Sequence, residues 1–285
     1  MARRELMPGQ KRITPGVIGG ELLTVAWFAF SLFPILWMIL LSLKSTADQQ
    51  VTFFSFSPTL ENFSYVLGGD TGANLRSGLI ESLITSIGAV LVSLVIGIPA
   101  AYAAGRWKYK GSDDLMFQML SFRFAPELMV LLPLFLIYKS LGLLDTRLGL
   151  IWVLQLVTMP LVVWILRSYF QDLPADLEQA ALLDGYTRTQ AFIRVALPLV
   201  RPGIAAGALL SFIFAWNSYV FPLVLANSKI KTVTVAIGTY QGGGGQVFYN
   251  HAAAAALIGA LPPLILALCI QRYLVRGLSF GAVKA

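Results

Sequence analysis

Long apolar runs alternate with short polar connections along the whole chain. A helix needs roughly 20 apolar residues to cross about 30 Å of hydrocarbon. Runs of this length occupy residues 17–43, 79–104, 115–138, 148–166, 203–226 and 252–270. The pattern predicts an all-α polytopic membrane protein with six transmembrane helices, which places both termini on one side of the membrane.

Composition supports this prediction, and the distribution of positive charge predicts which side of the membrane the termini occupy. Of the 285 residues, 57% are hydrophobic and 12% are charged, about half the charged fraction of soluble domains. Fourteen Lys and Arg residues lie in the tails and even-numbered connections, six lie on the opposite side, and Arg123 lies within a run, which accounts for all 21. Because Lys and Arg concentrate on the cytoplasmic side, both termini are predicted to be cytoplasmic. The net charge of +7 thus reflects orientation and gives no indication of nucleic-acid binding.

The runs divide the chain into predicted regions. These are a cytoplasmic N-terminal tail (1–16), a first transmembrane helix (17–43), an extracytoplasmic loop (44–78), a membrane core (79–271) that includes a cytoplasmic loop (171–201), and a cytoplasmic C-terminal tail (272–285). In the first loop, Leu60, Phe63 and Val66 predict a short amphipathic helix at the membrane surface. The glycine run 242–245 predicts a flexible external loop, because no Lys follows it as in a phosphate cradle.

The cytoplasmic loop 171–201 is polar and predicts two short helices with a hinge. Glu178 places negative charge near the positive N-terminal end of the first helix, and Gly185 ends that helix because glycine tolerates the left-handed conformation of a C-terminal cap. Thr187 and Gln190 have capping-box spacing for a second helix. Such a hairpin could pack on the bilayer or dock to a soluble partner. Acidic residues beside an anionic leaflet favour docking.

The same loop carries a family resemblance. It resembles the EAA loop of binding-protein-dependent ABC importer permeases, whose pattern is Glu-Ala-Ala, then Asp-Gly, then a hydrophobic residue, one spacer and Leu-Pro. The matching positions are Glu178, Ala180, Ala181, Asp184, Gly185, Val195, Leu197 and Pro198. The segments 58–63 (PTLENF), 142–146 (GLLDT), 216–217 (WN) and 275–284 (VRGLSFGAVK) are similar to the carbohydrate-uptake branch, the maltose-permease G-type subunits. The resemblance covers nearly the whole chain. In two departures, Glu81 stands where many relatives carry Asn, and Phe280 stands where small residues are commoner.

The resemblance implies a transport subunit that is not itself an enzyme. A coupling helix around residues 178–185 would insert into a groove on a dimer of ABC ATPase subunits, which hold the ATP and Mg, so that this chain binds no cofactor. A second homologous permease subunit and an extracytoplasmic solute-binding protein would complete the importer. Its location would be the cytoplasmic (inner) membrane of a bacterium or archaeon.

Polar groups inside the runs are candidates for the solute pathway, because their burial in a membrane is costly. Arg123 and Glu127 are four residues apart and could meet on one helix face, either as a structural pair or as ligands for sugar hydroxyls. Further candidates, which could instead serve in helix packing, are Trp216, Asn217, Tyr219 and Gln155.

A secondary transporter is the main alternative, with Glu81, Arg123 and Glu127 as a proton relay. The sequence shows no inverted repeat and no pair of broken helices, which such transporters commonly have. A membrane-embedded enzyme is disfavoured further, because His251 is the only histidine and no metal-ligand cluster is evident. The carried solute stays open among sugars, polyols and related compounds.

Overall fold

The computed structural model describes residues 15–48, 54–68, 75–107, 110–123, 127–226, 228–240 and 248–279, with side chains placed between residues 18 and 271. All regular secondary structure in these segments is helical. The helices are α1 (Pro15–Ser42), α2 (Glu61–Leu67), α3 (Leu75–Arg106), α4 (Ser112–Phe122), α5 (Glu127–Ser140), α6 (Arg147–Val153), α7 (Gln155–Asp172), α8 (Ala175–Leu183), α9 (Arg188–Ala191), the π-helix η1 (Phe192–Ala196), α10 (Leu197–Leu199), α11 (Arg201–Asn217), α12 (Val220–Leu225), α13 (Val233–Thr239) and α14 (Tyr249–Ser279).

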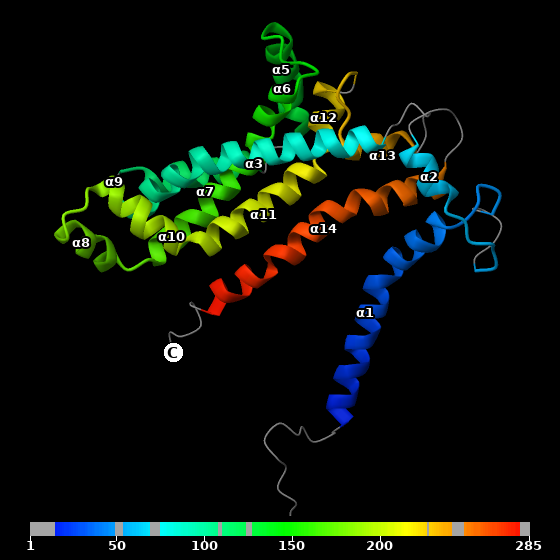
Figure 1. The fold of residues 1–285 in the computed structure, drawn as a ribbon, viewed down its shortest axis with the longest axis horizontal. Helices are drawn as coiled ribbons and strands as arrows, with labels where there is room; N and C mark the ends of the chain where they lie inside the picture. The colour runs from blue at the N-terminus through cyan, green and yellow to red at the C-terminus, as the bar shows by residue number, and fades with distance from the viewer. Residues whose placement is uncertain are drawn as a thin grey trace, which may run out of the picture.

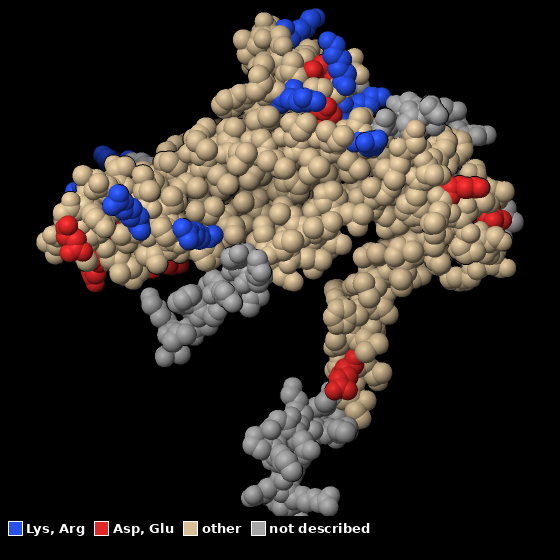
Figure 2. Space-filling model, viewed as in Figure 1, with Lys and Arg blue, Asp and Glu red and all other residues tan. Residues whose placement is uncertain are grey.

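Four long helices, α3, α7, α11 and α14, form an elongated body (Figure 1). The short helices α8, α9 and α10 lie at one end of this body, and α2 and α13 lie at the other. Helices α5, α6 and α12 form a group on one side, and α1 begins away from the body and packs on α14 where it reaches the body. Figure 2 shows a broad uncharged belt across the body, with charged side chains gathered toward its ends and on the projecting group.

Only three of the described helices, α1, α3 and α14, could each cross a membrane unbroken. Three further crossings arise if bent pairs count as single spans: α4 with α5 (90°), α6 with α7 (45°), and residues 188–199 with α11 (70°). The apolar runs 115–138, 148–166 and 203–226 are each interrupted in the structure, at the α4–α5, α6–α7 and α11–α12 breaks. In the last of these, α11 ends at Asn217, where Ser218 takes an extended backbone. Hydropathy misses such breaks because the broken segments are as apolar as unbroken ones. The exact six spans and the orientation of the termini stay predictions.

Helices α3 and α7 form the most extensive contact of the body. A β-carbon on Gly97 of α3 would lie 2.8 Å from Val162 Cγ1, so a larger residue there would force Val162 or the helix to shift. Ser93 Oγ donates to Gln155 Oε1 at 2.6 Å and also lies 2.6 Å from Thr158 Oγ1. Hydrogen bonds of this kind join transmembrane helices where apolar packing alone gives little specificity. The two helices are therefore joined both by close packing and by buried side-chain hydrogen bonds.

The predicted short helix of the first loop exists as α2, and it is tied into the body. Asn62 of α2 is buried, and its Nδ2 donates to the carbonyls of Ser42 and Lys44, both at 2.7 Å. Asn250 Nδ2 of α14 donates to Asn62 Oδ1 at 2.8 Å. This asparagine pair joins the end of α1 to α2 and α14, giving a structural reason for Asn in the segment 58–63. The glycine run 242–245 lies outside the described residues.

Candidate functional site

The loop between α7 and α11 begins with α8, whose end was predicted correctly. Gly185 has a φ of +86°, the left-handed conformation that favours glycine. The N–H of Tyr186 donates to Ala181 O at 3.0 Å and the N–H of Gly185 donates to Leu182 O at 3.1 Å. This is the Schellman pattern of a glycine-terminated helix. No heavy atom lies within 4 Å of a β-carbon built at Gly185, so backbone conformation alone selects glycine there.

The second half of the loop begins at the predicted capping box. Thr187 Oγ1 accepts the N–H of Gln190 at 3.3 Å, and Gln190 Oε1 accepts the N–H of Thr187 at 2.9 Å. The helix continues through η1 and α10 to Leu199 before the 70° bend into α11. Leu197 and Pro198 are half-buried next to this bend. Their place in the structure fits a role in setting the angle between the loop and the membrane helix.

Glu178 points back into its own chain and bonds to the last turns of α3. Tyr102 Oη donates to Glu178 Oε2 at 2.8 Å, and Arg106 Nε donates to Glu178 Oε1 at 2.8 Å. Arg106 also donates to the carbonyl of Leu173 at 2.7 Å, where α7 passes into the loop. The Arg106 and Glu178 side chains are only 12% and 15% exposed. We call Glu178, Arg106 and Tyr102 the Glu178 anchor.

Aromatic rings surround the anchor and connect it to both halves of the loop. The Tyr102 ring lies 5.2 Å from that of Phe170 in α7 and 4.5 Å from that of Phe192 in η1. Charge-assisted hydrogen bonds are roughly twice as strong as neutral ones, and partial burial reduces their screening. The anchor thus fixes α8 and η1 to the end of α3.

The opposite face of α8 has no partner within the described part of the chain. Leu183 is 89% exposed, Leu177 is 43% exposed, and Ala180 and Asp184 are exposed beside them. Ala181 alone among the described α8 residues is buried, at 5% exposure. An apolar face this exposed at the end of a helix hairpin is typical of a contact with another protein.

A second site lies where three membrane segments break. A cavity of about 240 Å³ is lined by Phe122, Arg123, Glu127, Val130, Leu156, Val157, Phe214 and Phe221. These residues come from the α4–α5 break, the start of α7 and the α11–α12 break. We call it the helix-break cavity. Interrupted helices in membrane proteins expose backbone ends only where they line a cavity or are covered by protein, and transporters place solute sites there.

Arg123 and Glu127 share this cavity but lie on different helices. Arg123 follows the last residue of α4 and Glu127 begins α5, so the expectation of a shared helix face was wrong. No ion pair joins them in the described residues. The Arg123 guanidinium instead lies over the Phe214 ring, 4.0 Å from its centroid. Stacking holds the guanidinium in one plane while its N–H groups can still donate to a ligand. Sequence reasoning missed Phe214, because only the helix breaks bring it to Arg123.

The remaining pathway candidates do not line the cavity. Trp216 is buried and donates its Nε1–H to Gly259 O of α14 at 3.0 Å. Gln155 belongs to the α3–α7 contact, where its Nε2 also donates to Ala89 O at 3.1 Å. Asn217 and Tyr219 are exposed at the end of α11, and Asn217 Nδ2 donates to Ile213 O in its own helix at 2.8 Å.

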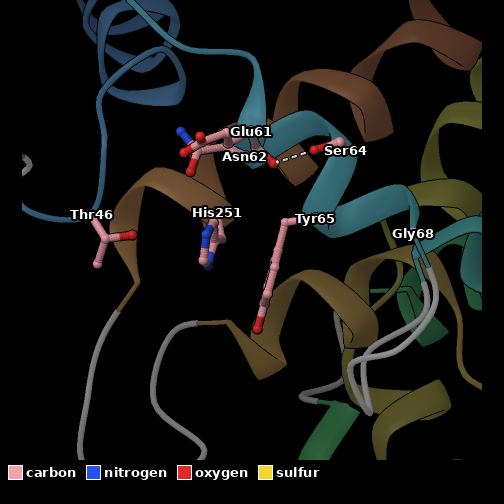
Figure 3. Close-up of a pocket in the computed structure, with 7 residues that line it drawn as sticks. All are labelled: Thr46, Glu61, Asn62, Ser64, Tyr65, Gly68 and His251. Carbon is pink, nitrogen blue, oxygen red and sulfur yellow. Dashed lines mark hydrogen bonds between the residues drawn. The ribbon is translucent and has the colours of Figure 1, made fainter. Parts of the chain in front are cut away.

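At the far end of the body, the structure has a larger hollow that the sequence did not reveal. Its volume is about 520 Å³, and the residues lining it are Thr46, Glu61, Asn62, Ser64, Tyr65, Gly68 and His251. Figure 3 shows Tyr65 and His251 side by side, and their rings stack at 4.1 Å between centroids. In the described residues no group of three or more His, Cys, Asp or Glu side chains is placed to hold a metal ion.

Asp145 of the segment 142–146 fastens one connecting turn to another. Its Oδ1 accepts the backbone N–H groups of Ser228, Lys229 and Ile230 at 3.2, 3.1 and 3.3 Å. Burial raises the pKa of Asp145, but these three donors outweigh it and hold the pKa below its ordinary value. Asp145 also has a φ of +55°, which Asp tolerates better than most residues.

Comparisons with known proteins place this geometry in a family. Residues 93–280 match the model of the binding-protein-dependent transport system inner membrane component. The trehalose transport system permease protein of Mycobacterium tuberculosis is 35% identical over 258 residues, covering 90% of this chain and 93% of that protein. The trehalose/maltose transport system permease protein of Thermococcus litoralis is 34% identical, covering 94% and 95%.

A solved structure shares the fold. It is the crystal structure of a bacterial ABC transporter involved in the import of the acidic polysaccharide alginate, of which one chain aligns with a TM-score of 0.74. The alignment covers 94% of this chain and 99% of that chain at 23% identity. At this identity the likeness shows the fold alone and carries no information on the solute.

Proposed function

The chain belongs to the family of binding-protein-dependent transport system inner membrane components, and on this premise we propose that it is the permease subunit of an ATP-driven sugar importer. Its solute would be a sugar or a related polyhydroxylated compound, as the names of the trehalose, maltose and diacetylchitobiose relatives suggest. The observation that carries the proposal is α8, anchored on one face through Glu178 and exposed on the other at Leu183.

In this proposal α8 is the coupling helix. Its exposed face, with Ala180, Asp184 and Leu183, enters a groove on an ABC ATPase, and ATP and Mg stay on that ATPase dimer. Because the Glu178 anchor bonds the other face of α8 to α3, a displacement of α8 is transmitted directly to α3. Gly185 keeps the short helix in a fixed direction.

The other proposed partners and the membrane arrangement follow from the family. A second homologous permease subunit would share the membrane core, and an extracytoplasmic solute-binding protein would deliver the solute at the end of the body that carries α2 and α13. Counting each bent pair as one span gives six crossings, with both termini in the cytoplasm of a bacterium or archaeon. The chain itself catalyses no reaction and holds no cofactor.

The helix-break cavity is the proposed part of the solute pathway in this subunit. Arg123 donates and Glu127 accepts, a pair of roles that suits hydroxyl groups, which do both. Phe122, Phe214 and Phe221 supply apolar faces. Asn217 and Tyr219 extend the candidate surface from the end of α11, while Trp216 and Gln155 support it through helix contacts.

A secondary transporter is less well supported, although one argument against it was wrong. Broken helices do occur, at the α4–α5 and α6–α7 breaks. Glu81, however, forms an ion pair with Arg147 at 2.7 Å, which makes it a poor proton carrier. The family membership decides between the two functions.

Uptake by the reconstituted complex tests the proposal. The chain is co-expressed with a candidate partner permease, ATPase and binding protein from the same organism, and radiolabelled trehalose and maltose are offered to proteoliposomes. We expect uptake that requires the binding protein and enclosed ATP. Uptake driven by a proton gradient without ATP would contradict the proposal.

A further inference from the structure

Helix α3 runs the length of the body and is bonded at both ends. Its 32 residues span about 48 Å, and Figure 1 shows it reaching from the α8–α10 end to the α2–α13 end. Near its last residue lies the Glu178 anchor. About seven helical turns away, Glu81 and Ser82 bond to two elements at the other end.

The first of these bonds is a two-pronged ion pair. Arg147 Nε donates to Glu81 Oε2 at 2.8 Å, and a second guanidinium nitrogen of Arg147 donates to Glu81 Oε1 at 2.7 Å. The planar fork fixes the direction of both side chains as well as their distance. Arg147 is the first residue of α6, so the pair ties α3 directly to α6, beyond the 45° bend that separates α6 from α7.

The second bond is buried. Ser82 Oγ accepts the N–H of Val233 at 2.8 Å, at the first residue of α13. Gly78, one turn earlier, lets α13 approach, because a β-carbon there would lie 3.2 Å from Ala236 Cβ. We call Glu81–Arg147 and Ser82–Val233 the far-end contacts. Two neighbouring residues of one helix thus hold α6 and α13.

Between its two ends α3 cannot easily stretch or slip. Helix α3 continues from Leu75 to Arg106 although Pro99 inside it lacks the N–H for one intrahelical hydrogen bond. The Ser93, Gln155 and Thr158 contacts hold it to α7. A rigid helix bonded at both ends transmits a displacement applied at one end to whatever is bonded at the other. The Glu81–Arg147 pair is partly exposed, and such pairs add little to stability. Its contribution is to hold α6 in a fixed direction relative to α3.

We infer that α3 is the mechanical link between the coupling helix and the opposite face, and that Glu81, Arg147 and Ser82 are positioning residues that deliver its movement to α6 and α13. This inference rests on the proposed function. It gives Glu81, which departs from the Asn of many relatives, a structural role, because Asn cannot form an ion pair with Arg147.

The test measures coupling across the membrane. In nanodiscs holding the full complex, ATP hydrolysis is measured with and without purified binding protein supplied with trehalose and maltose. Arg147→Gln is expected to reduce the stimulation by binding protein at least about fivefold, the lower range of coupling between sites. Hydrolysis without binding protein stays unchanged, because the Glu178 anchor is intact. Ser82→Ala is expected to reduce stimulation independently.

Two controls test whether the effect of Arg147→Gln comes from loss of the Glu81–Arg147 pair. The alternatives are loss of any positive charge at this end of α3, or misfolding. Arg76→Gln removes an exposed charge near the same end of α3 and is expected to leave stimulation unchanged. Combining Glu81→Arg with Arg147→Glu is expected to restore stimulation. Wild-type stimulation in Arg147→Gln, or no recovery in the reversed pair, overturns the inference. A wild-type complex that binding protein does not stimulate contradicts the proposed function, and the inference then falls with it.

Discussion

The Glu178 anchor and the helix-break cavity each place a charged residue away from full solvent, but they satisfy it differently. Glu178 is held by Arg106 and Tyr102 of its own chain. Arg123 stacks on Phe214 and has no ion pair with Glu127, although both line one cavity. A charge satisfied within the chain positions a structural element. A charge held in place but still able to donate is suited to binding a ligand.

This difference separates the expected effects of mutation. Changes in the loop should alter how ATP hydrolysis is linked to transport, because α8 carries movement. Changes in the cavity should alter the solute concentration needed for transport, because Arg123 and Glu127 would contact the solute.

The largest effect is expected from Gly185→Val. A β-branched residue at a φ of +86° costs about 1–2 kcal/mol or more, and relief of this strain would turn α8 away from its partner. We expect at least a roughly tenfold loss of uptake with normal membrane insertion. Gly185→Asn is the matched control, since Asn tolerates this conformation, and it should transport well. Wild-type uptake and ATPase stimulation in Gly185→Val would contradict this role.

Next in size is the loss of the Glu178 anchor. Glu178→Gln and Arg106→Gln each remove charge-assisted hydrogen bonds, which contribute about 2 kcal/mol. If the two residues act through each other, the double variant loses no more uptake per ATP hydrolysed than either single variant. Tyr102→Phe removes one hydrogen bond and should have a smaller effect. Additive losses would show that Glu178 works mainly outside the anchor.

A different kind of effect, on the solute concentration needed for uptake, is expected from Arg123→Gln. The solute concentration for half-maximal uptake should rise roughly tenfold, the loss of about 1–2 kcal/mol of hydrogen bonding, while basal ATP hydrolysis stays the same. Phe214→Leu should give a shift of roughly two- to fivefold, because cation–π stacking is worth about 0.5–1 kcal/mol. If Arg123→Gln changes ATP coupling and leaves the half-maximal concentration alone, the cavity is not part of the pathway.

The smallest effect concerns Asp145, which lies outside both regions. The folded-state pKa of Asp145 is lowered. Its charged form therefore stabilises the fold at pH values above the ordinary Asp pKa of about 3.9. This stability is lost as the pH falls through the folded-state pKa. Asp145→Asn keeps a residue that tolerates the positive φ. Its thermal midpoint in detergent should lie a few degrees below wild type at neutral pH, with the difference vanishing in acid. A difference independent of pH would rule out the charge as its cause.

The loop was predictable from sequence because its signals are local. The Gly185 cap and the Thr187–Gln190 box each act over a few residues, and both formed as expected. The partner of Glu178 was not predictable, since Arg106 lies 72 residues earlier and no pattern links them. The cavity was missed for a further reason. Hydropathy reports that a segment is apolar but not where its helix breaks, and the breaks bring Arg123 to Phe214.

Cysteine crosslinking on α8 tests the central claim most directly. In a Cys269→Ser background, which removes the only cysteine, Leu183→Cys places a thiol on the 89% exposed position and Ala181→Cys places one on the 5% exposed position of the same helix. In membranes containing the whole complex, a short thiol-to-amine crosslinker should join the ATPase subunit to Leu183→Cys and leave Ala181→Cys unlinked. No ATPase crosslink from Leu183→Cys, in a complex that still transports, would contradict the assignment of α8 as the coupling helix.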